Sequence, residues 1–386
     1  MIKKIVIGTT VLLLILLLLS LKSKDNGKKL TGAENGNKAA VSATDSKRTF
    51  LLGFTQWPPS FDAKEIESMY GFQKQNSDLS VYHQVEGVAW PEALAGGKYP
   101  KRLVDNWNFV KSHFPKGRPV YLALTPLNDS RTGLANYANE KSDQEALPAP
   151  WSGYALNQQE VKNAYLNYVE EAVNFFQPEF LAIDIESNVL LSKDPKKWNE
   201  FLDLHEYIYK TLKKKYPELV IFSTVQYEHL NATQADAFGK AKLQKAEVEK
   251  LLKNSDLFAL STYPYMSKIK PVRESYFDLA LSLNKPIAIA ETGYASKDFS
   301  VYGYKFEQSP EDQRQYFDVL FKAAAANNFK FIVNFAAFDY VKLLQSLPKP
   351  ARELAGVWVY TGLKNSEGAD KPAFMLWQNE LVKQLE

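Results

Sequence analysis

From residue 49 onward, short apolar runs alternate with longer amphipathic stretches. The apolar runs occupy residues 49–57, 79–90, 119–128, 180–188, 220–229, 257–265, 286–294 and 331–340. The stretches between them carry apolar residues at three- and four-residue spacing, which predicts helices at 101–112, 158–176, 196–215, 240–253, 270–283 and 310–328. Strands that alternate with helices predict an α/β fold with a parallel sheet. Eight such units predict a closed (β/α)8 TIM barrel.

The first apolar run leads into GFTQWPPS, which has one glycine followed by two prolines. The glycine-rich loops that cradle nucleotide phosphates after a first strand are therefore missing. This argues against an open sheet built around a nucleotide and leaves the barrel as the predicted fold.

The N-terminus differs from the rest of the chain. Residues 1–21 carry two lysines at positions 3 and 4 and continue as an uncharged, leucine-rich run at 5–21, which is typical of an export signal and long enough to span a bilayer. A cleaved signal peptide and an uncleaved signal anchor are both consistent with this pattern. Residues 22–48 are polar and contain no aromatic residue, so we expect a flexible, disordered linker before a barrel domain at 49–386. The barrel is therefore expected outside the cytoplasm, either secreted or anchored at the outer face of the cytoplasmic membrane.

Composition removes several function classes. The 47 basic and 44 acidic residues nearly balance, so nucleic acid is not an expected partner. The absence of cysteine excludes disulfides, thiolate metal sites and a cysteine nucleophile. The four histidines show no i, i+4 pairing on a helix, and no Gly-x-Ser-x-Gly motif occurs. We expect neither a metal nor a cofactor, and we expect a monomer.

Polar and aromatic residues gather where the predicted strands end, which is where barrel enzymes build their active sites. Glu186 and Glu291 end the fourth and seventh runs, and strand alternation predicts that Asp184 and Glu186 share one face. Two carboxyl groups about 5 to 5.5 Å apart are what retaining glycosidases require, and flat aromatic rings suit the faces of sugars. The predicted substrate is thus a poly- or oligosaccharide. The expected supporting residues are Tyr263, Asp184 and Asn188, and the expected sugar-binding residues are Trp57, His83, Trp90, Gln226, Tyr265 and Tyr294.

Two of these runs carry a family resemblance. LFALSTYPY (257–265) and PIAIAETGY (286–294) are similar to the strand-six and strand-seven segments of clan A glycoside hydrolases, and most closely resemble the family 53 endo-β-1,4-galactanases. GLKNSEGADKPAF (362–374) resembles the segment that precedes the last helix in that family. The resemblance implies retaining hydrolysis of β-glycosidic bonds. It makes Glu186 the acid/base and Glu291 the nucleophile, and it places Tyr263 in contact with that nucleophile.

One position departs from the clan pattern and keeps two alternatives open. Ile185 precedes Glu186, where the clan has an asparagine that binds the sugar 2-hydroxyl, so this contact is either missing or supplied from elsewhere, with Asp184 and Asn188 as candidates. The Asp-Ile-Glu step also resembles family 18 chitinase-like barrels, in which a substrate acetamido group is the nucleophile and Glu186 would be the acid; Ala182 stands where that family expects a further aspartate. The other alternative is a carbohydrate-binding barrel at the cell surface that has no turnover.

Overall fold

The computed structural model describes residues 47–231, 241–301 and 303–386. The predicted signal or anchor segment lies outside these residues, as does the predicted linker up to residue 46. No helix in the described part of the chain combines the length and the hydropathy that a membrane span requires.

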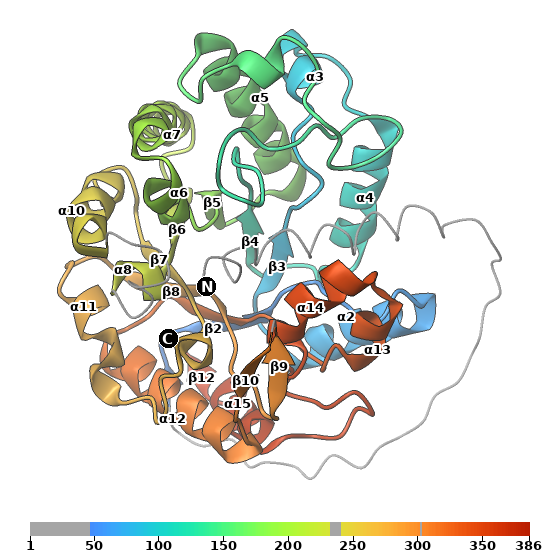
Figure 1. The fold of residues 1–386 in the computed structure, drawn as a ribbon, viewed down its shortest axis with the longest axis vertical. Coiled ribbons are helices and arrows are strands. Elements are labelled where there is room, and N and C mark those ends of the chain that lie inside the picture. The colour runs from blue at the N-terminus through green and yellow to red at the C-terminus, as the bar shows by residue number, and fades with distance from the viewer. Residues whose placement is uncertain (1–46, 232–240, 302) are drawn as a thin grey trace.

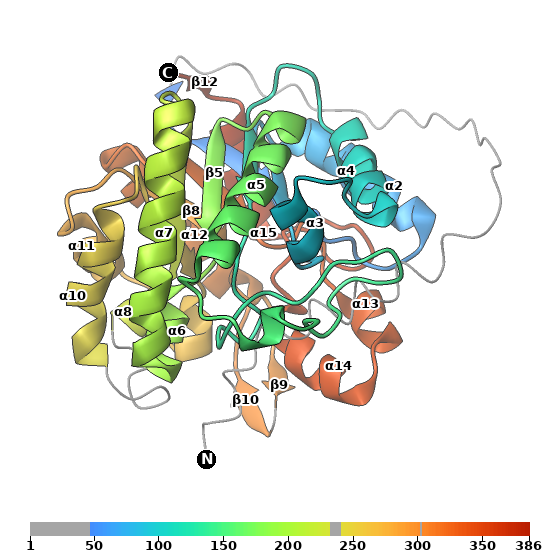
Figure 2. The same cartoon turned by 90° about the horizontal axis from the view of Figure 1, so that it is seen from above.

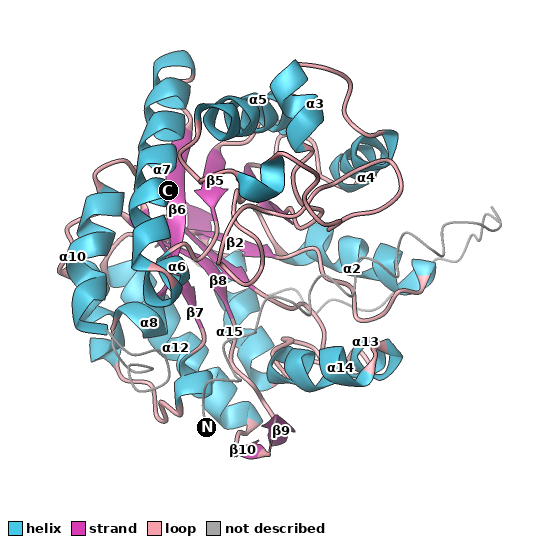
Figure 3. Ribbon diagram, turned by 45° about the horizontal axis from the view of Figure 1, so that its top comes forward, coloured by secondary structure: helices cyan, strands magenta, loops and turns pink. Residues whose placement is uncertain are grey.

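Within the described residues, a ring of parallel strands forms the centre of the molecule and helices surround it (Figures 1 and 3). The strand order is β2-β11-β8-β7-β6-β5-β4-β3, and every neighbouring pair is parallel. A parallel bridge between Gly53 and Leu79 closes the ring between β2 and β3. The strands are β2 (Leu51–Phe54), β3 (Ser80–His83), β4 (Val120–Ala123), β5 (Phe180–Asp184), β6 (Val220–Gln226), β7 (Phe258–Thr262), β8 (Ile287–Thr292) and β11 (Phe331–Asn334). Each predicted apolar run contains one of them, so the (β/α)8 barrel is confirmed.

The bridge that closes the barrel between β2 and β3 requires glycine at position 53. A Cβ atom at this position would lie 2.8 Å from Cγ2 of Val81, closer than carbon atoms pack. The first and second strands of the barrel can therefore approach each other only because residue 53 is glycine.

The barrel has an inner and an outer apolar layer. Small and bulky side chains alternate inside, including Tyr121, Ala182, Phe222 and Phe331. The opposite faces of the same strands pack against the helices and form the larger core. This alternation follows from the two-residue period of a strand.

Most predicted helices agree with the structure within two residues. The long helices are α2 (Ala63–Asn76), α4 (Lys101–Ser112), α5 (Gln159–Phe176), α7 (Pro195–Lys215), α10 (Ala241–Leu252), α12 (Pro310–Ala326) and α15 (Pro372–Leu381). The helix predicted at 270–283 is wrong at its start, because only the 3-10 turn Glu274–Phe277 and α11 (Asp278–Leu281) are helical. Pro271 disfavours helical backbone only at residue 270, the predicted start, so it does not by itself explain why the helical turns begin as late as Glu274.

Shorter elements lie in the connections between the strands and the long helices. The carboxyl-end connections carry α3 (Trp90–Ala95), α6 (Asn188–Lys193), α8 (Tyr227–Leu230), α13 (Val341–Ser346), α14 (Lys349–Ala355), the 3-10 turns Trp151–Gly153, Pro264–Ser267 and Gly356–Trp358, and the antiparallel hairpin β9 (Phe299–Val301) and β10 (Tyr304–Phe306). The hairpin and α14 lie at one end of the barrel, and the C-terminus lies at the other (Figure 2). These connections build the rim on which the candidate site stands.

The first and the last described residues of the chain pair with each other, just before the predicted boundary at 49. The two-residue strand β1 (Lys47–Arg48) pairs in parallel with β12 (Gln384–Leu385). Arg48 is buried, forms an ion pair with Asp78 and donates a hydrogen bond from Nε to the carbonyl oxygen of Glu380 at 2.8 Å. The last two residues of the predicted linker therefore belong to the fold.

Candidate active site

Glu186 stands just beyond β5, where a bulge changes the strand's alternation. The register with β6 runs from Ala182 opposite Phe222 to Asp184 opposite Ser223, so one residue is left over. Ile185 packs inside the barrel, whereas Asp184 faces the helices. Ile183 packs in the outer core and Ile185 inside the barrel, so the bulge interrupts the two-residue alternation from which the shared face of Asp184 and Glu186 was predicted.

Asp184 belongs to a buried polar cluster on the helix side. Its Oδ2 atom accepts a hydrogen bond from Ser223 Oγ at 2.7 Å and lies 2.9 Å from Nδ1 of His205 on α7. His205 Nε2 lies 2.7 Å from the carbonyl oxygen of Asn254. Asp184 thus ties β5 to its covering helix and is not placed to contact a sugar.

Glu186 itself adopts left-handed backbone geometry, with φ at 50°. For a residue with a Cβ atom this conformation costs of order 1 to 3 kcal/mol and tends to occur at functional sites. The Glu186 amide donates to Thr224 Oγ1 at 2.8 Å, and Nη2 of Arg131 lies 3.9 Å from Glu186 Oε2. Arg131 also donates from Nε to the carbonyl oxygen of Ile185 at 2.8 Å, which braces the turn.

Burial raises the pKa of Glu186 to about 7, and the negative charge of Glu291 adds to the increase. Arg131 and Lys193 act in the opposite direction, because their positive charges favour the carboxylate. A carboxyl group with this pKa holds a proton near neutral pH and can give it to a leaving oxygen. The two predicted glutamates therefore influence each other electrostatically across the barrel mouth.

Glu291 lies near the end of β8 and is held by two neighbours. The Tyr263 hydroxyl donates a hydrogen bond to Oε1, and Nδ1 of His83 lies 3.4 Å from Oε2. His83 ends β3 and is positioned by Gln56, whose side-chain amide exchanges two hydrogen bonds with the His83 backbone, at 2.6 and 3.2 Å. The side chain of Glu291 is 12% exposed, so it is accessible at the rim while its oxygens remain oriented.

Glu228 supports Tyr263 from beneath. This fully buried carboxylate accepts hydrogen bonds from the Tyr263 amide at 2.8 Å, from Thr262 Oγ1 at 2.8 Å and from the Tyr276 hydroxyl at 2.5 Å. Burial raises its pKa. Because its oxygens are engaged by the protein, Glu228 fixes the position of the tyrosine that holds Glu291.

Asn188 and Gln226 brace each other and are not available to a ligand in this structure. Asn188 Nδ2 donates to the carbonyl oxygen of Gln226 at 3.0 Å, and the Gln226 amide donates to Asn188 Oδ1 at 2.8 Å. The side chain of Gln226 bonds to Glu228 Oε2 and to the His229 amide. Both amides complete hydrogen bonds between α6, β6 and α8, and a sugar contact at Asn188 or Gln226 stays a prediction.

Three aromatic residues predicted to bind sugar are core residues. Trp90 is fully buried, stacks on Trp151 and donates from Nε1 to a backbone carbonyl oxygen. The hydroxyl of Tyr265 donates to Val357 at 2.6 Å, and that of Tyr294 donates to Ile269 at 3.1 Å. These buried rings fill the space between loops, and a sugar-binding role for Trp90, Tyr265 and Tyr294 stays a prediction.

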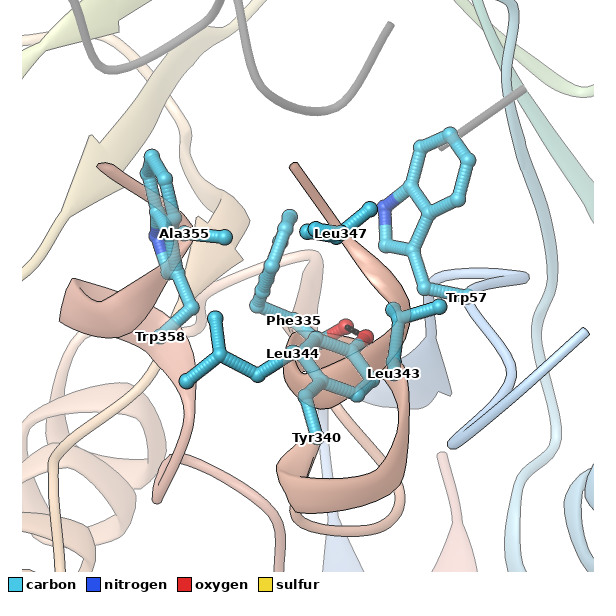
Figure 4. A pocket seen from close by; sticks show the side chains of 8 residues that line it. All are labelled: Trp57, Phe335, Tyr340, Leu343, Leu344, Leu347, Ala355 and Trp358. Atoms are coloured by element: carbon cyan, nitrogen blue, oxygen red, sulfur yellow. Dashed lines mark hydrogen bonds between the residues drawn. The ribbon is translucent and has the colours of Figure 1, made fainter. Parts of the chain in front are cut away.

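Trp57 has a different setting, because it lines an apolar pocket at the rim (Figure 4). The eight residues that line this pocket are Trp57, Phe335, Tyr340, Leu343, Leu344, Leu347, Ala355 and Trp358. The Tyr263 ring lies 6.1 Å from that of Phe335 and 6.3 Å from that of Trp358, measured between centroids. The pocket therefore adjoins the tyrosine that bonds to Glu291.

Sequence reasoning missed Arg131, Lys193, Phe335 and Trp358. Phe335 follows the eighth strand directly, so its position at a strand end was a usable signal. Arg131 and Trp358 lie in long connections whose path no local pattern predicts. Among the described residues, no group of three or more histidine, aspartate or glutamate side chains could hold a metal ion.

Comparison with known proteins gives the fold but no sequence relative. No protein-family model matches the chain, and no curated protein matches it. Solved structures do match. An exo-β-1,4-mannosidase from Opitutaceae bacterium strain TAV5 is 13% identical with a TM-score of 0.57, over 89% of this chain and 62% of that one. The chain thus spans less than two thirds of the mannosidase.

Two further structures match over nearly their whole length. A fungal β-1,4-galactanase is 16% identical with a TM-score of 0.51, over 85% of this chain and 94% of that one. Xylanase 10B from Thermotoga maritima is 10% identical with a TM-score of 0.54, over 86% of this chain and 95% of the xylanase. The chain therefore shares the (β/α)8 fold of these glycoside hydrolases. One of them is a galactanase, the type of enzyme that the strand-six and strand-seven motifs resemble.

Proposed function

We propose that the chain is a retaining glycoside hydrolase that cleaves β-glycosidic bonds of a poly- or oligosaccharide. One observation carries the proposal: two rim glutamates lie in unlike environments within reach of each other's charge. Glu186 has a pKa of about 7, and Glu291 is held by the Tyr263 hydroxyl and His83. Pairs of carboxyl groups with divergent environments are how glycosidases divide the acid and nucleophile roles.

In the proposed mechanism, Glu291 attacks the anomeric carbon and forms a glycosyl-enzyme ester. Protonated Glu186 gives its proton to the departing glycosidic oxygen as that bond breaks. Glu186, now a carboxylate, removes a proton from water, and the resulting attack on the anomeric carbon releases the sugar with its original configuration. Tyr263 keeps one lone pair of Glu291 occupied, so the other oxygen faces the sugar.

The fold agreement supports the reaction class, since the mannosidase and the galactanase named above act on β-1,4-linked sugars by their names and the third structure is a xylanase. The contacts of Glu291 count against the chitinase-like alternative, in which this residue has no role. A non-catalytic sugar-binding barrel would not need a carboxyl group with left-handed backbone geometry and a raised pKa.

Reducing-sugar release from a panel of β-linked polysaccharides tests the proposal, with the wild type measured beside Glu291→Gln. Release that disappears in the variant is the expected result, and product NMR should show the retained anomer first. Release that survives the substitution would transfer the nucleophile role to the substrate and favour the chitinase-like mechanism. Binding without release in the wild type would identify a sugar-binding barrel.

We also propose, from residues 1–21 alone, that the protein is exported and either released or anchored at the outer face of the cytoplasmic membrane. If the protein is anchored, protease added to intact spheroplasts should degrade it while a cytoplasmic marker stays intact. If it is released, the protein should be found in the medium. Protection of the barrel from the protease would contradict export.

A further inference from the structure

Two cationic side chains stand beside Glu186, on the side of the barrel mouth that lies away from Glu291. Arg131 belongs to the connection after β4, and Lys193 is the last residue of α6. In the closed ring of strands, β4 and β8 are four places apart, so the loop after β4 faces Glu291 across the mouth. In the proposed reaction, the sugar that leaves toward Glu186 is therefore the part of the substrate nearest to these cations.

The loop that carries Arg131 has a defined shape. An antiparallel bridge joins Leu127 to Leu134, so residues 127–134 form a short hairpin with Arg131 near its tip. The backbone of Arg131 has left-handed geometry, with φ at 52°, which few residues with a Cβ atom adopt. The hairpin thus returns the chain toward β5 and brings the arginine to the acid.

Two lysine side chains from the following helices brace this hairpin. Nζ of Lys193 donates to the carbonyl oxygen of Ser130, and Nζ of Lys197, on α7, donates to that of Thr132 at 2.6 Å. Both lysine residues are half-buried. The positive charge of Lys193 also favours the ionised form of Glu186, so its ammonium group lies near the acid.

The guanidinium group of Arg131 has a donor left over after it has braced the loop. Nε donates to the carbonyl oxygen of Ile185 at 2.8 Å, and Nη1 donates to that of Asn128 at 3.1 Å. Within the described residues, Nη2 donates no hydrogen bond, and its ion-pair contact with Glu186 Oε2 is long, at 3.9 Å. A guanidinium group pairs most strongly with the oxygens of an anionic group, so Nη2 is an anion donor directly beside the acid.

The positive charges of Arg131 and Lys193 work against the proposed role of Glu186. A general acid has to hold its proton, whereas both cations favour the carboxylate and lower the pKa of Glu186. Burial and the negative charges of Glu291 and Glu228 act in the opposite direction and outweigh them. Because the protonated acid has no charge, it does not neutralise the two cations, and an anion of the substrate can do so instead.

Two further titratable groups lie near the cations and do not neutralise them near pH 7. Asp129 is in the same hairpin, and burial raises its pKa to about 7 although the charge of Arg131 opposes the increase. Burial and the positive charge of Lys193 lower the pKa of His229 to about 3, so this histidine adds no charge. The region beside Glu186 therefore keeps a net positive charge.

We propose that Arg131 and Lys193 bind an anionic group, a uronate carboxylate or a sulfate ester, on the sugar that leaves toward Glu186. The substrate is then an acidic glycan, and this inference rests on the proposed function. One oxygen of the group accepts a hydrogen bond from Nη2 of Arg131, and another accepts from the ammonium group of Lys193. The negative charge compensates both cations and keeps Glu186 protonated until the leaving oxygen takes the proton.

Binding is measured on pairs of glycans that differ only in charge. Oligosaccharides of glucuronoxylan and of hyaluronan are compared with the same fragments after reduction of the carboxyl groups to alcohols, and chondroitin sulfate is compared with desulfated chondroitin. In calorimetric titrations of Glu291→Gln, which lacks the proposed nucleophile, the more anionic member of at least one pair should bind about tenfold tighter or better, because hydrogen bonds between charged groups provide that factor. A preference in the carboxyl pairs identifies a uronate, and one in the sulfate pair identifies a sulfate ester.

A matched pair of variants tests the location. Lys193→Gln and Lys197→Gln each remove one positive charge, and glutamine retains an N–H donor for the hairpin carbonyl in both. Lys193→Gln should reduce the preference at least threefold, whereas Lys197→Gln should keep it. Since both variants have the same net charge, a general attraction between the protein and a polyanion cannot produce this difference. Arg131→Met should bring the preference to within twofold of unity, and the thermal midpoint of each variant shows that it is folded.

The pH dependence of wild-type hydrolysis gives an independent readout. An anion bound beside Arg131 raises the pKa of Glu186, so the alkaline limb of kcat should lie about one pH unit above that of kcat/KM, which reports the free enzyme. With the neutral member of the same pair, the two limbs should coincide.

The outcomes distinguish failure of the anion site from failure of the hydrolase. Equal affinity within every pair, or a preference that Lys193→Gln and Arg131→Met both retain, overturns the anion site. A preference that falls equally in Lys193→Gln and Lys197→Gln comes from net charge and overturns it as well. Hydrolysis of charged and neutral members with equal kcat/KM overturns the anion site and leaves the hydrolase in place. A preference that depends on Lys193, without reducing-sugar release by the wild type, supports the anion site and removes the hydrolase.

Discussion

The buried Glu186 side chain should destabilise the folded protein at pH values above its pKa, where the carboxylate is ionised. Replacing it with an uncharged residue should remove this destabilisation. Its pKa rises from 4.5 to about 7 on folding, because the side chain is buried near Glu291. The folded state therefore holds the proton more tightly than the unfolded chain does. Stability that depends on this proton is complete below pH 4.5 and is lost as the pH rises through about 7.

The magnitude follows from the two pKa values. At about 1.36 kcal/mol per pKa unit, the difference between 4.5 and about 7 corresponds to roughly 3 kcal/mol. Some of this is already lost at pH 5, so about 2 to 3 kcal/mol separates pH 5 from pH 8. Glutamine resembles the protonated acid in shape and carries no charge. Glu186→Gln should therefore be more stable than the wild type by this amount at pH 8 and nearly equal to it at pH 5.

Urea unfolding at pH 5, 6, 7 and 8, followed by tryptophan fluorescence, measures this difference. Burial also raises the pKa of Glu86 and of Asp129 to about 7, but both groups are present in wild type and variant and cancel in the comparison. Glu249→Gln, at an exposed position on α10, controls for a general effect of losing a carboxylate. A stability difference that does not change with pH, or a Glu186→Gln variant that is less stable at pH 8, would refute the reasoning.

The remaining predictions concern the neighbours of the two glutamates. Activity should fall above about pH 7 as Glu186 loses the proton it donates, and Arg131→Met should move this limb of the kcat/KM profile to higher pH because a cation that lowers the pKa of Glu186 is gone. An alkaline limb at the same pH in the variant would show that Arg131 does not lower the pKa of Glu186. Tyr263→Phe removes a hydrogen bond to a carboxylate, so kcat should fall about 10- to 100-fold when measured on the folded variant in the absence of urea; a loss below threefold would contradict its positioning role. Asp184→Asn should lower the free energy of unfolding by about 2 kcal/mol, since Asp184 forms buried hydrogen bonds with Ser223 and His205; equal urea curves for variant and wild type would refute this.

The helix boundaries illustrate how much local sequence decides. Ser309 and Asp312 form a reciprocal capping box and Pro310 occupies the first turn of α12, so the start of this helix follows from four residues. The barrel itself follows from the repeated change between two-residue and 3.6-residue periodicity. The capping box and the periodicity are short-range properties, because the face that a strand or helix buries is set by neighbouring residues along the chain.

The candidate site divides in the same way. Glu186, Glu291, Tyr263 and His83 were identifiable because each ends or directly follows a strand, and parallel strands in a closed barrel bring their carboxyl ends to one rim. The direction in which Asp184 points was not identifiable. It depends on a single extra residue in the pairing between β5 and β6, which exists only when the two strands meet.

Periodicity and strand ends are local properties, so the barrel, its polar rim and the positions of the two glutamates on that rim could be predicted from the chain alone. Which of the buried rings also lines the apolar pocket depends on tertiary structure, because Trp57 and Trp90 each precede a proline and differ in the loops that cover them. Tertiary structure likewise placed Arg131 beside Glu186 and Trp358 beside Tyr263. Contacts across tens of residues depend on how long connections fold back over the barrel, and no period in the chain encodes that path.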